Sequence, residues 1–169
     1  MPLTLLLGGA RSGKSSLAVR RAAAAGAPVV FVATGEAGDD EMAARIERHR
    51  EERPSSWTTV EEPRDLEAAV AGAPAAACVV IDCLSLWVAN VFESGIDVER
   101  RADAIAAAAA ARPGPTIAVS NEVGLGVVPA TPLGRAYRDV LGRVNAIFAA
   151  RADEAFFVVA GKALRLEDV

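Results

Sequence analysis

The segment Gly8-Gly9-Ala10-Arg11-Ser12-Gly13-Lys14-Ser15 constrains the fold more than any other part of the chain. It matches the pattern G-x-x-x-x-G-K-[ST], in which small residues let successive backbone N–H groups turn inward around phosphate oxygens. An apolar run, Leu3 to Leu7, precedes the segment, and a helix-compatible segment, Lys14 to Ala25, follows it. Because such a loop joins a strand to a helix, we predict a phosphate-binding loop at the carboxyl end of a buried strand.

Two side chains of this loop are expected to carry most of its chemistry. Lys14 is predicted to reach the terminal phosphates of a nucleoside triphosphate, and the hydroxyl of Ser15 is predicted to bind Mg²⁺. The whole loop is expected to contact the nucleotide through Gly8, Gly9, Ala10, Arg11, Ser12, Gly13, Lys14 and Ser15.

Short apolar runs alternate with helix-compatible segments along the rest of the chain. Strands are predicted at Leu3 to Leu7, Val29 to Ala33, Cys78 to Asp82, Thr116 to Ser120 and Ala155 to Ala160, with a further short strand near Trp57 to Val60. Helices are predicted at Lys14 to Ala25, Asp40 to Arg53, Pro63 to Ala71, Leu84 to Phe92, Val98 to Arg112 and Gly134 to Arg151.

This alternation favours one α/β domain over residues 1–169, with the fold of a P-loop NTPase of the RecA-like kind. The apolar runs are continuous rather than alternating with polar residues, which is typical of a mainly parallel sheet with helices on both faces. A length of 169 residues leaves no room for a second full domain.

A second buried strand is expected to end in the carboxylate of Asp82, after Val79-Val80-Ile81. An apolar run followed by Asp is common, and a structural cap is the alternative to a functional role. Beside a phosphate loop, however, an acidic group at the carboxyl edge of the sheet is well placed to bind Mg²⁺, directly or through water.

Charge and composition exclude several classes of function. The chain carries 22 acidic and 18 basic residues, a net charge of −4, which argues against a general nucleic-acid or membrane-surface binder. Cys78 and Cys83 are its two cysteines, and both fall in or beside an apolar run, so a disulfide framework is not expected. No apolar stretch reaches membrane-spanning length, and we expect a cytoplasmic protein.

His49 is the one histidine of the chain. In a helix over Asp40 to Arg53, the residues Arg45, His49 and Arg53 are four apart and share one face, which would attract a polyphosphate. Neighbouring guanidinium groups disfavour the imidazolium form, so a neutral nitrogen could attack phosphorus. From spacing alone, a solvated side chain is the more ordinary interpretation of a histidine among Arg and Glu.

Several motifs together resemble one known family, the bifunctional adenosylcobinamide kinase/adenosylcobinamide-phosphate guanylyltransferases of the cobalamin pathway. The resemblance extends over almost the entire chain. Its marks are the phosphate loop, Ala33-Thr34, Asp39-Asp40-Glu41-Met42-Ala43-Ala44-Arg45-Ile46, His49, Arg53-Pro54, Trp57, Asn121-Glu122-Val123-Gly124 with Gly126 and Pro129, and Gly142-Arg143-Val144-Asn145.

The resemblance implies two reactions on adenosylcobinamide and its phosphate. ATP or GTP would phosphorylate the aminopropanol hydroxyl, and GMP would then pass from GTP to the new phosphate, giving adenosylcobinamide-GDP and pyrophosphate. It also implies that His49 forms a histidine–GMP intermediate, which makes His49 and Lys14 the predicted catalytic residues. It further suggests a homotrimer.

The resemblance also carries over a set of nucleotide contacts outside the loop, namely Ala33, Thr34, Gly35, Arg50, Glu51, Glu52, Arg53, Glu61 and Asp82. Asp82 stands where glutamate is common in the family, and Gly35 where serine is expected. Glu62 adjoins Glu61, and either acid could make the contact.

Four alternatives stay open at the level of sequence. The segment Asn121 to Pro129 could bind substrate or act as a rigid connector, and Arg135, Arg138 and Arg143 could hold a phosphate or simply be solvated. The chain could also be a kinase or guanylyltransferase with one activity only. A nucleotide-dependent regulatory module, which would bind a partner without becoming labelled by GMP, is the alternative from another class.

Overall fold

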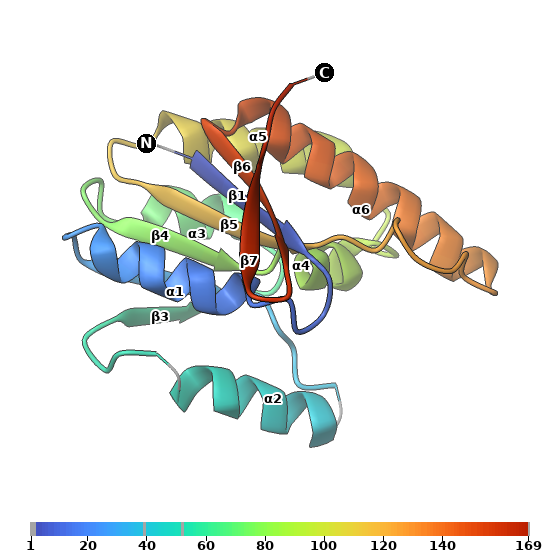
Figure 1. Cartoon of the computed structure of the whole chain (residues 1–169), viewed down its shortest axis with the longest axis horizontal. Coiled ribbons are helices and arrows are strands. Elements are labelled where there is room, and N and C mark those ends of the chain that lie inside the picture. Colours follow the sequence, from blue (N-terminus) through green and yellow to red (C-terminus); the bar gives the residue numbers. More distant parts are fainter. Residues whose placement is uncertain (1–2, 39, 52, 169) are drawn as a thin grey trace.

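A seven-stranded sheet forms the centre of the computed structural model, which describes residues 3–38, 40–51 and 53–168 (Figure 1). Its strands lie in the order β3-β2-β4-β5-β1-β6-β7, and every neighbouring pair is parallel except β6 and β7. The mainly parallel P-loop α/β fold predicted from the sequence is therefore confirmed. The strands are β1 (Leu3–Gly8), β2 (Val29–Ala33), β3 (Thr58–Glu61), β4 (Cys78–Asp82), β5 (Thr116–Asn121), β6 (Glu154–Val159) and β7 (Lys162–Leu166).

Helices cover both faces of this sheet, as the continuous apolar strands require. Alternate residues of β1 enter different cores: Leu3 and Leu5 join the core under α3, α4, α5 and α6, whereas Leu6 joins the core under α1. The helices are α1 (Lys14–Ala24), α2 (Asp40–Glu51), α3 (Leu66–Gly72), α4 (Leu84–Val91), α5 (Val98–Ala111) and α6 (Pro132–Arg151).

Two helix starts differ from the predicted ones because polar side chains cap them. The predicted helix from Pro63 begins at Leu66, since the carboxylate of Asp65 accepts a hydrogen bond from the N–H of Ala68. The helix predicted from Gly134 begins at Pro132, since the hydroxyl of Thr131 accepts from the N–H of Gly134 at 3.1 Å.

The parallel strands bring their carboxyl ends to one edge of the sheet. There Gly8 of β1 lies opposite Asn121 of β5, and Ala33 of β2 lies between Asp82 of β4 and Glu61 of β3. In Figure 1, α2 lies off the sheet, below β3, rather than against the layers that the other helices form. Among the described residues, none of the helices is both long and apolar enough to cross a membrane.

Candidate active site

The phosphate loop folds at the carboxyl end of β1 in a shape that favours glycine at two positions, Gly8 and Gly13. A Cβ on Gly8 would lie 2.6 Å from Ser12 Oγ and closer still to the carbonyl oxygen of Val158. Gly13, the N-cap residue before α1, has φ of 97°, a left-handed conformation that favours glycine. The N–H of Gly161, in the turn between β6 and β7, donates to the carbonyl of Ser12 at 2.9 Å, so the hairpin supports the loop from outside.

Lys14 is held against this loop rather than extended into solvent. Lys14 is only 7% exposed, and its Nζ donates a hydrogen bond to the carbonyl oxygen of Gly9 at 3.1 Å. The lysine thus bridges the loop beneath the position where terminal phosphates bind in proteins with this motif.

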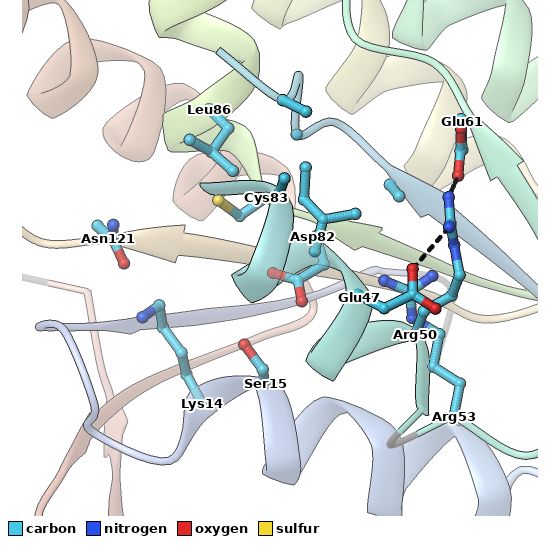
Figure 2. Close-up of a pocket in the computed structure, with 15 residues that line it drawn as sticks. Lys14, Ser15, Glu47, Arg50, Arg53, Glu61, Asp82, Cys83, Leu86 and Asn121 are labelled. Carbon is cyan, nitrogen blue, oxygen red and sulfur yellow. Dashed lines mark hydrogen bonds and ion pairs between the residues drawn. The ribbon is translucent and has the colours of Figure 1, made fainter. Parts of the chain in front are cut away.

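A pocket of about 330 Å³ opens beside the loop, a size within the range of roughly 300–1,000 Å³ that is usual for small-molecule sites (Figure 2). Eight residues that the sequence predicts as nucleotide contacts line it: Lys14, Ser15, Ala33, Gly35, Arg50, Arg53, Glu61 and Asp82. Seven further residues that the prediction omits also line it: Ala37, Ala43, Ile46, Glu47, Cys83, Leu86 and Asn121.

The pocket has two ends of different chemistry. Figure 2 shows Lys14, Ser15 and Asp82 facing one another at one end, close to Asn121. At the other end lie Glu47 and Arg50 of α2, together with Glu61 at the end of β3. A triphosphate and the group attached to it could therefore bridge the phosphate loop and α2.

The first end offers hard oxygen donors that fit a magnesium ion. The hydroxyl of Ser15 and the carboxylate of Asp82 both line the pocket. Within the described residues, no group of three or more His, Cys, Asp or Glu side chains is arranged to hold a metal. Mg²⁺ does not need such a cage, because it is usually bound by one or two protein oxygens together with phosphate oxygens and water.

Aromatic side chains fix the position of Arg53. Its guanidinium lies 3.9 Å from the ring centroid of Phe31, and that ring stacks against Trp57 with centroids 6.4 Å apart. Such a cation–π contact restrains a long side chain that would otherwise be free to move. Trp57 therefore has a structural role: it packs against Phe31, which in turn holds the pocket residue Arg53.

Glu61 and Glu62, which the sequence leaves as alternatives, do different things. Glu61 lines the pocket and forms an ion pair with Arg50, and this hydrogen-bonded carboxylate raises the pKa of the guanidinium further above its usual value. Glu62 instead accepts hydrogen bonds from the N–H groups of Arg64 and Asp65, at 2.9 and 2.8 Å, before α3. Of the two acids, Glu61 is the one that lines the pocket.

Thr34 and Gly35 follow β2 but differ in their surroundings. Thr34 is fully buried, is not among the lining residues, and its hydroxyl bonds to the backbone of Cys83. Gly35 lines the pocket, where a Cβ would lie 3.3 Å from Ile46 Cδ1. The serine expected from the resemblance would crowd this contact between β2 and α2.

Three of the predicted residues cannot be placed fully. His49 and Glu51 belong to α2, but their side chains lie outside the described residues, as does that of Arg45, and Glu52 lies outside them altogether. What can be placed is the chain around His49: Glu47 precedes it, Arg50 follows it, and both line the pocket. The remaining predicted contacts, Gly8 to Gly13, form the loop beneath.

Cys83 lines the pocket with a neutral thiol rather than with a nucleophilic thiolate. Burial is the main cause that raises the pKa of its thiol, and the neighbouring Asp82 carboxylate acts in the same direction. The thiol lies 2.9 Å from the hydroxyl of Ser85. At neutral pH it therefore keeps its proton, which excludes the thiolate that nucleophilic attack requires.

The fold and this site define the class of protein: an α/β protein with a phosphate-binding loop and a nucleotide-sized pocket at the carboxyl edge of its sheet. Comparison with known sequences gives the family. Residues 4–166 match the family described as cobinamide kinase / cobinamide phosphate guanyltransferase, and the chain belongs to it.

Three curated proteins are similar to this chain over nearly its full length. The chain is 45% identical over 168 residues to the bifunctional adenosylcobalamin biosynthesis protein CobP of Pseudomonas aeruginosa, with 96% of each chain covered. It is 38% identical over 185 residues to the bifunctional adenosylcobalamin biosynthesis protein CobU of Salmonella typhimurium, and 36% identical over 184 residues to CobU of Escherichia coli. Both alignments cover 98% of this chain and 99% of the relative.

Proposed function

We propose that this chain catalyses two successive reactions in one pocket. In the first, the γ-phosphoryl group of ATP or GTP passes to the aminopropanol hydroxyl of adenosylcobinamide. In the second, GMP passes from GTP to the new phosphate by way of His49, with release of pyrophosphate. The observation that carries the proposal is that the phosphate loop, through Lys14 and Ser15, and the helix that contains His49, through Glu47 and Arg50, line the same pocket.

The first reaction depends chiefly on positioning and charge. The backbone N–H groups of the loop, the start of α1 and Lys14 hold the terminal phosphates, because the developing charge lies on the phosphoryl oxygens. Ser15 and Asp82 would hold Mg²⁺, which when bound neutralises phosphate charge. The acceptor hydroxyl then forms a bond to the γ-phosphorus as the bond to the β,γ-bridging oxygen breaks.

The second reaction needs a nucleophile near the α-phosphorus. The neutral imidazole of His49 would attack it, forming a P–N bond while the bond to the pyrophosphate oxygen breaks. An oxygen of the cobinamide phosphate would then attack the same phosphorus and free the imidazole. Arg50 and Arg53, which line the α2 end of the pocket, are positioned to balance the charge of the phosphates.

A labelling experiment tests the proposal. Wild-type protein incubated with Mg²⁺ and GTP labelled at the α-phosphate should retain acid-labile, alkali-stable label, and a His49→Ala variant should retain none. The variant should still transfer γ-phosphate to adenosylcobinamide. Absence of covalent label on the wild type would contradict the intermediate, and nucleotide-dependent capture of a partner without either transfer would favour the regulatory module instead.

The assembly that we propose is a homotrimer of single-domain chains, each comprising residues 1–169. Exposed apolar side chains around the β5–α6 loop support contact between copies: Leu125, Val127, Val128 and Leu133 are 77%, 95%, 63% and 54% exposed. Light scattering would give three times the mass of the chain, and Val127→Ser should weaken the assembly. The free, buried Cys78 and Cys83 suit the reducing cytoplasm in which we propose that the protein works.

A further inference from the structure

Asn121 occupies a central position at the phosphate end of the pocket. It is the last residue of β5, the strand between β1 and β4, and it lies in register with Gly8, the first glycine of the phosphate loop. Its side chain lines the pocket and is the sole carboxamide among the described lining residues. Figure 2 shows it at the side of Lys14 and Cys83, away from Arg50 and Glu61.

The backbone around Asn121 is held on both sides. Nδ2 of Asn145, a residue of α6 that is only 5% exposed, donates to the carbonyl oxygen of Asn121 at 3.0 Å. The hydroxyl of Ser120 donates to Oδ1 of Asn145 at 2.6 Å, and the N–H of Glu122 donates to the carbonyl of Gly8 at 3.1 Å. A buried amide with both ends bonded rigidifies its surroundings.

The two asparagines therefore divide their tasks. The end of β5 already has a structural partner in Asn145. The side-chain amide of Asn145 is hydrogen-bonded to the carbonyl oxygen of Asn121 and to the hydroxyl of Ser120. Asn121 adds nothing to that network through its side chain, which faces the pocket that Lys14 and Asp82 also line. A preorganised donor beside a phosphate site is an established way to stabilise charge that develops during reaction.

We propose that Asn121 is a catalytic residue of the phosphoryl-transfer step, and that Asn145 and Ser120 are positioning residues that hold it. The inference rests on the proposed function. The side-chain N–H of Asn121 donates to a γ-phosphoryl oxygen while the acceptor hydroxyl bonds to the γ-phosphorus. The bond to the bridging oxygen breaks, its electron pair leaves with the nucleoside diphosphate, and water takes up the hydroxyl proton.

This assignment predicts an effect on one reaction rather than on both. The γ-phosphoryl group belongs at the Lys14 end, whereas the α-phosphorus must come within reach of the helix that contains His49. In GMP transfer the γ-phosphate leaves unchanged as part of pyrophosphate, so an amide that contacts only a γ-phosphoryl oxygen contributes little to that reaction. Lys14 differs, because a lysine at this position reaches the β-phosphate as well and contributes to both reactions. A residue that merely supported the fold would affect both reactions alike.

Two substitutions of Asn121 test the catalytic role. Asn121→Ala should lower kcat for γ-phosphate transfer to adenosylcobinamide about 100-fold, with KM for the nucleotide and the rate of His49 labelling by α-labelled GTP changed less than about threefold. Asn121→Asp, which has the same size, should be slower still because its carboxylate repels the phosphoryl oxygens. Unchanged kcat, or equal losses in both reactions, would overturn the assignment.

The positioning role of Asn145 is tested by a double-mutant cycle. Asn145→Ala should lower kcat for γ-phosphate transfer in the wild type and have little further effect in the Asn121→Ala background, because both act through one contact. Additive losses would overturn that role. Asp103→Asn, on the exposed face of α5, is the control and should behave as wild type.

If wild-type protein transfers no γ-phosphate at all, both the proposed function and the inference are wrong. If wild type is active and Asn121→Ala is equally active, only the inference is wrong.

Discussion

The hydroxyl of Thr34 and the backbone of Cys83 exchange two hydrogen bonds. The N–H of Cys83 donates to Thr34 Oγ1 at 2.8 Å, and that hydroxyl donates to the Cys83 carbonyl at 2.7 Å. Asn90 strengthens the connection, since its Nδ2 donates to the carbonyls of Thr34 and Pro63 at 2.8 and 3.0 Å. The ends of β2, β3 and β4 are thus tied together directly behind the pocket, next to Asp82.

Thr34→Val should therefore destabilise the fold, because it leaves the buried N–H of Cys83 without its acceptor and leaves the Cys83 carbonyl with the N–H of Trp87 alone. We expect the free energy of unfolding to fall by about 1–3 kcal/mol. Thr34→Ser keeps the hydroxyl and should lose less than half of that. Urea denaturation compares the three proteins, and equal stability of the Val and Ser variants would show that the hydroxyl does not hold this turn.

Gly8 and Gly9 are adjacent but differ in the space around them. A Cβ at Gly8 would collide with Ser12 Oγ, 2.6 Å away, whereas nothing lies within 4 Å of a Cβ at Gly9. Without nucleotide, Gly8→Ala should lower the free energy of unfolding by about 1–3 kcal/mol, and Gly9→Ala should change it by less than about 0.5 kcal/mol. Thermal unfolding of both variants checks this, and similar melting temperatures would refute the steric argument.

Glu61 and Glu62 offer a matched pair for separating binding from stability. Glu61→Ala should weaken GTP binding roughly tenfold, the loss typical of a charged hydrogen bond, with little change in stability because its ion pair with Arg50 is exposed. Glu62→Ala should leave GTP affinity unchanged but cost about 1 kcal/mol of stability through the start of α3. Calorimetric titration with GTP and urea denaturation measure the two effects, and the opposite pattern would reassign the contact to Glu62.

Alkaline pH should destabilise the protein through a buried thiol. Burial raises the pKa of Cys78 from 9.0 to about 11, so the unfolded chain loses this proton between these values while the folded chain retains it. The free energy of unfolding should then fall as pH rises from about 9 to 11, with a slope of up to about 1.4 kcal/mol per pH unit from this group. Cys78→Ala should have a shallower slope in denaturation at pH 8, 9, 10 and 11; an unchanged slope would contradict the assignment.

Much of the fold could be predicted because its strands are fully covered. The runs beginning at Leu3, Val29, Cys78 and Thr116 are continuously apolar and became β1, β2, β4 and β5. β7 was missed, because all five of its residues are exposed and it pairs only at the antiparallel edge. Its turn also lacks the usual Asn-Gly signal: Ala160 and Gly161 adopt φ of 50° and 74°.

The candidate site could be predicted where a residue type implies its chemistry. The spacing of Gly13, Lys14 and Ser15 indicates a phosphate loop, and the structure places Lys14 and Ser15 on the pocket. Asn121 was indicated only as the start of the segment Asn121 to Pro129, for which substrate binding and a rigid connector stayed equal alternatives. Thr34 shows the converse. The resemblance predicts a nucleotide contact there, but its buried hydroxyl bonds to the backbone of Cys83. A hydroxyl that bonds to the backbone and one that contacts a ligand have the same local sequence pattern.

The central claim is that one pocket serves both reactions, and Lys14→Met tests it most directly. The substitution keeps the length of a side chain that is 7% exposed but removes its charge, while His49→Ala serves as the comparison. Both γ-phosphate transfer to adenosylcobinamide and covalent labelling by α-labelled GTP should fall about 100-fold or more in Lys14→Met, whereas His49→Ala should lose only the labelling. Wild-type labelling in Lys14→Met, alongside lost phosphate transfer, would contradict a shared pocket.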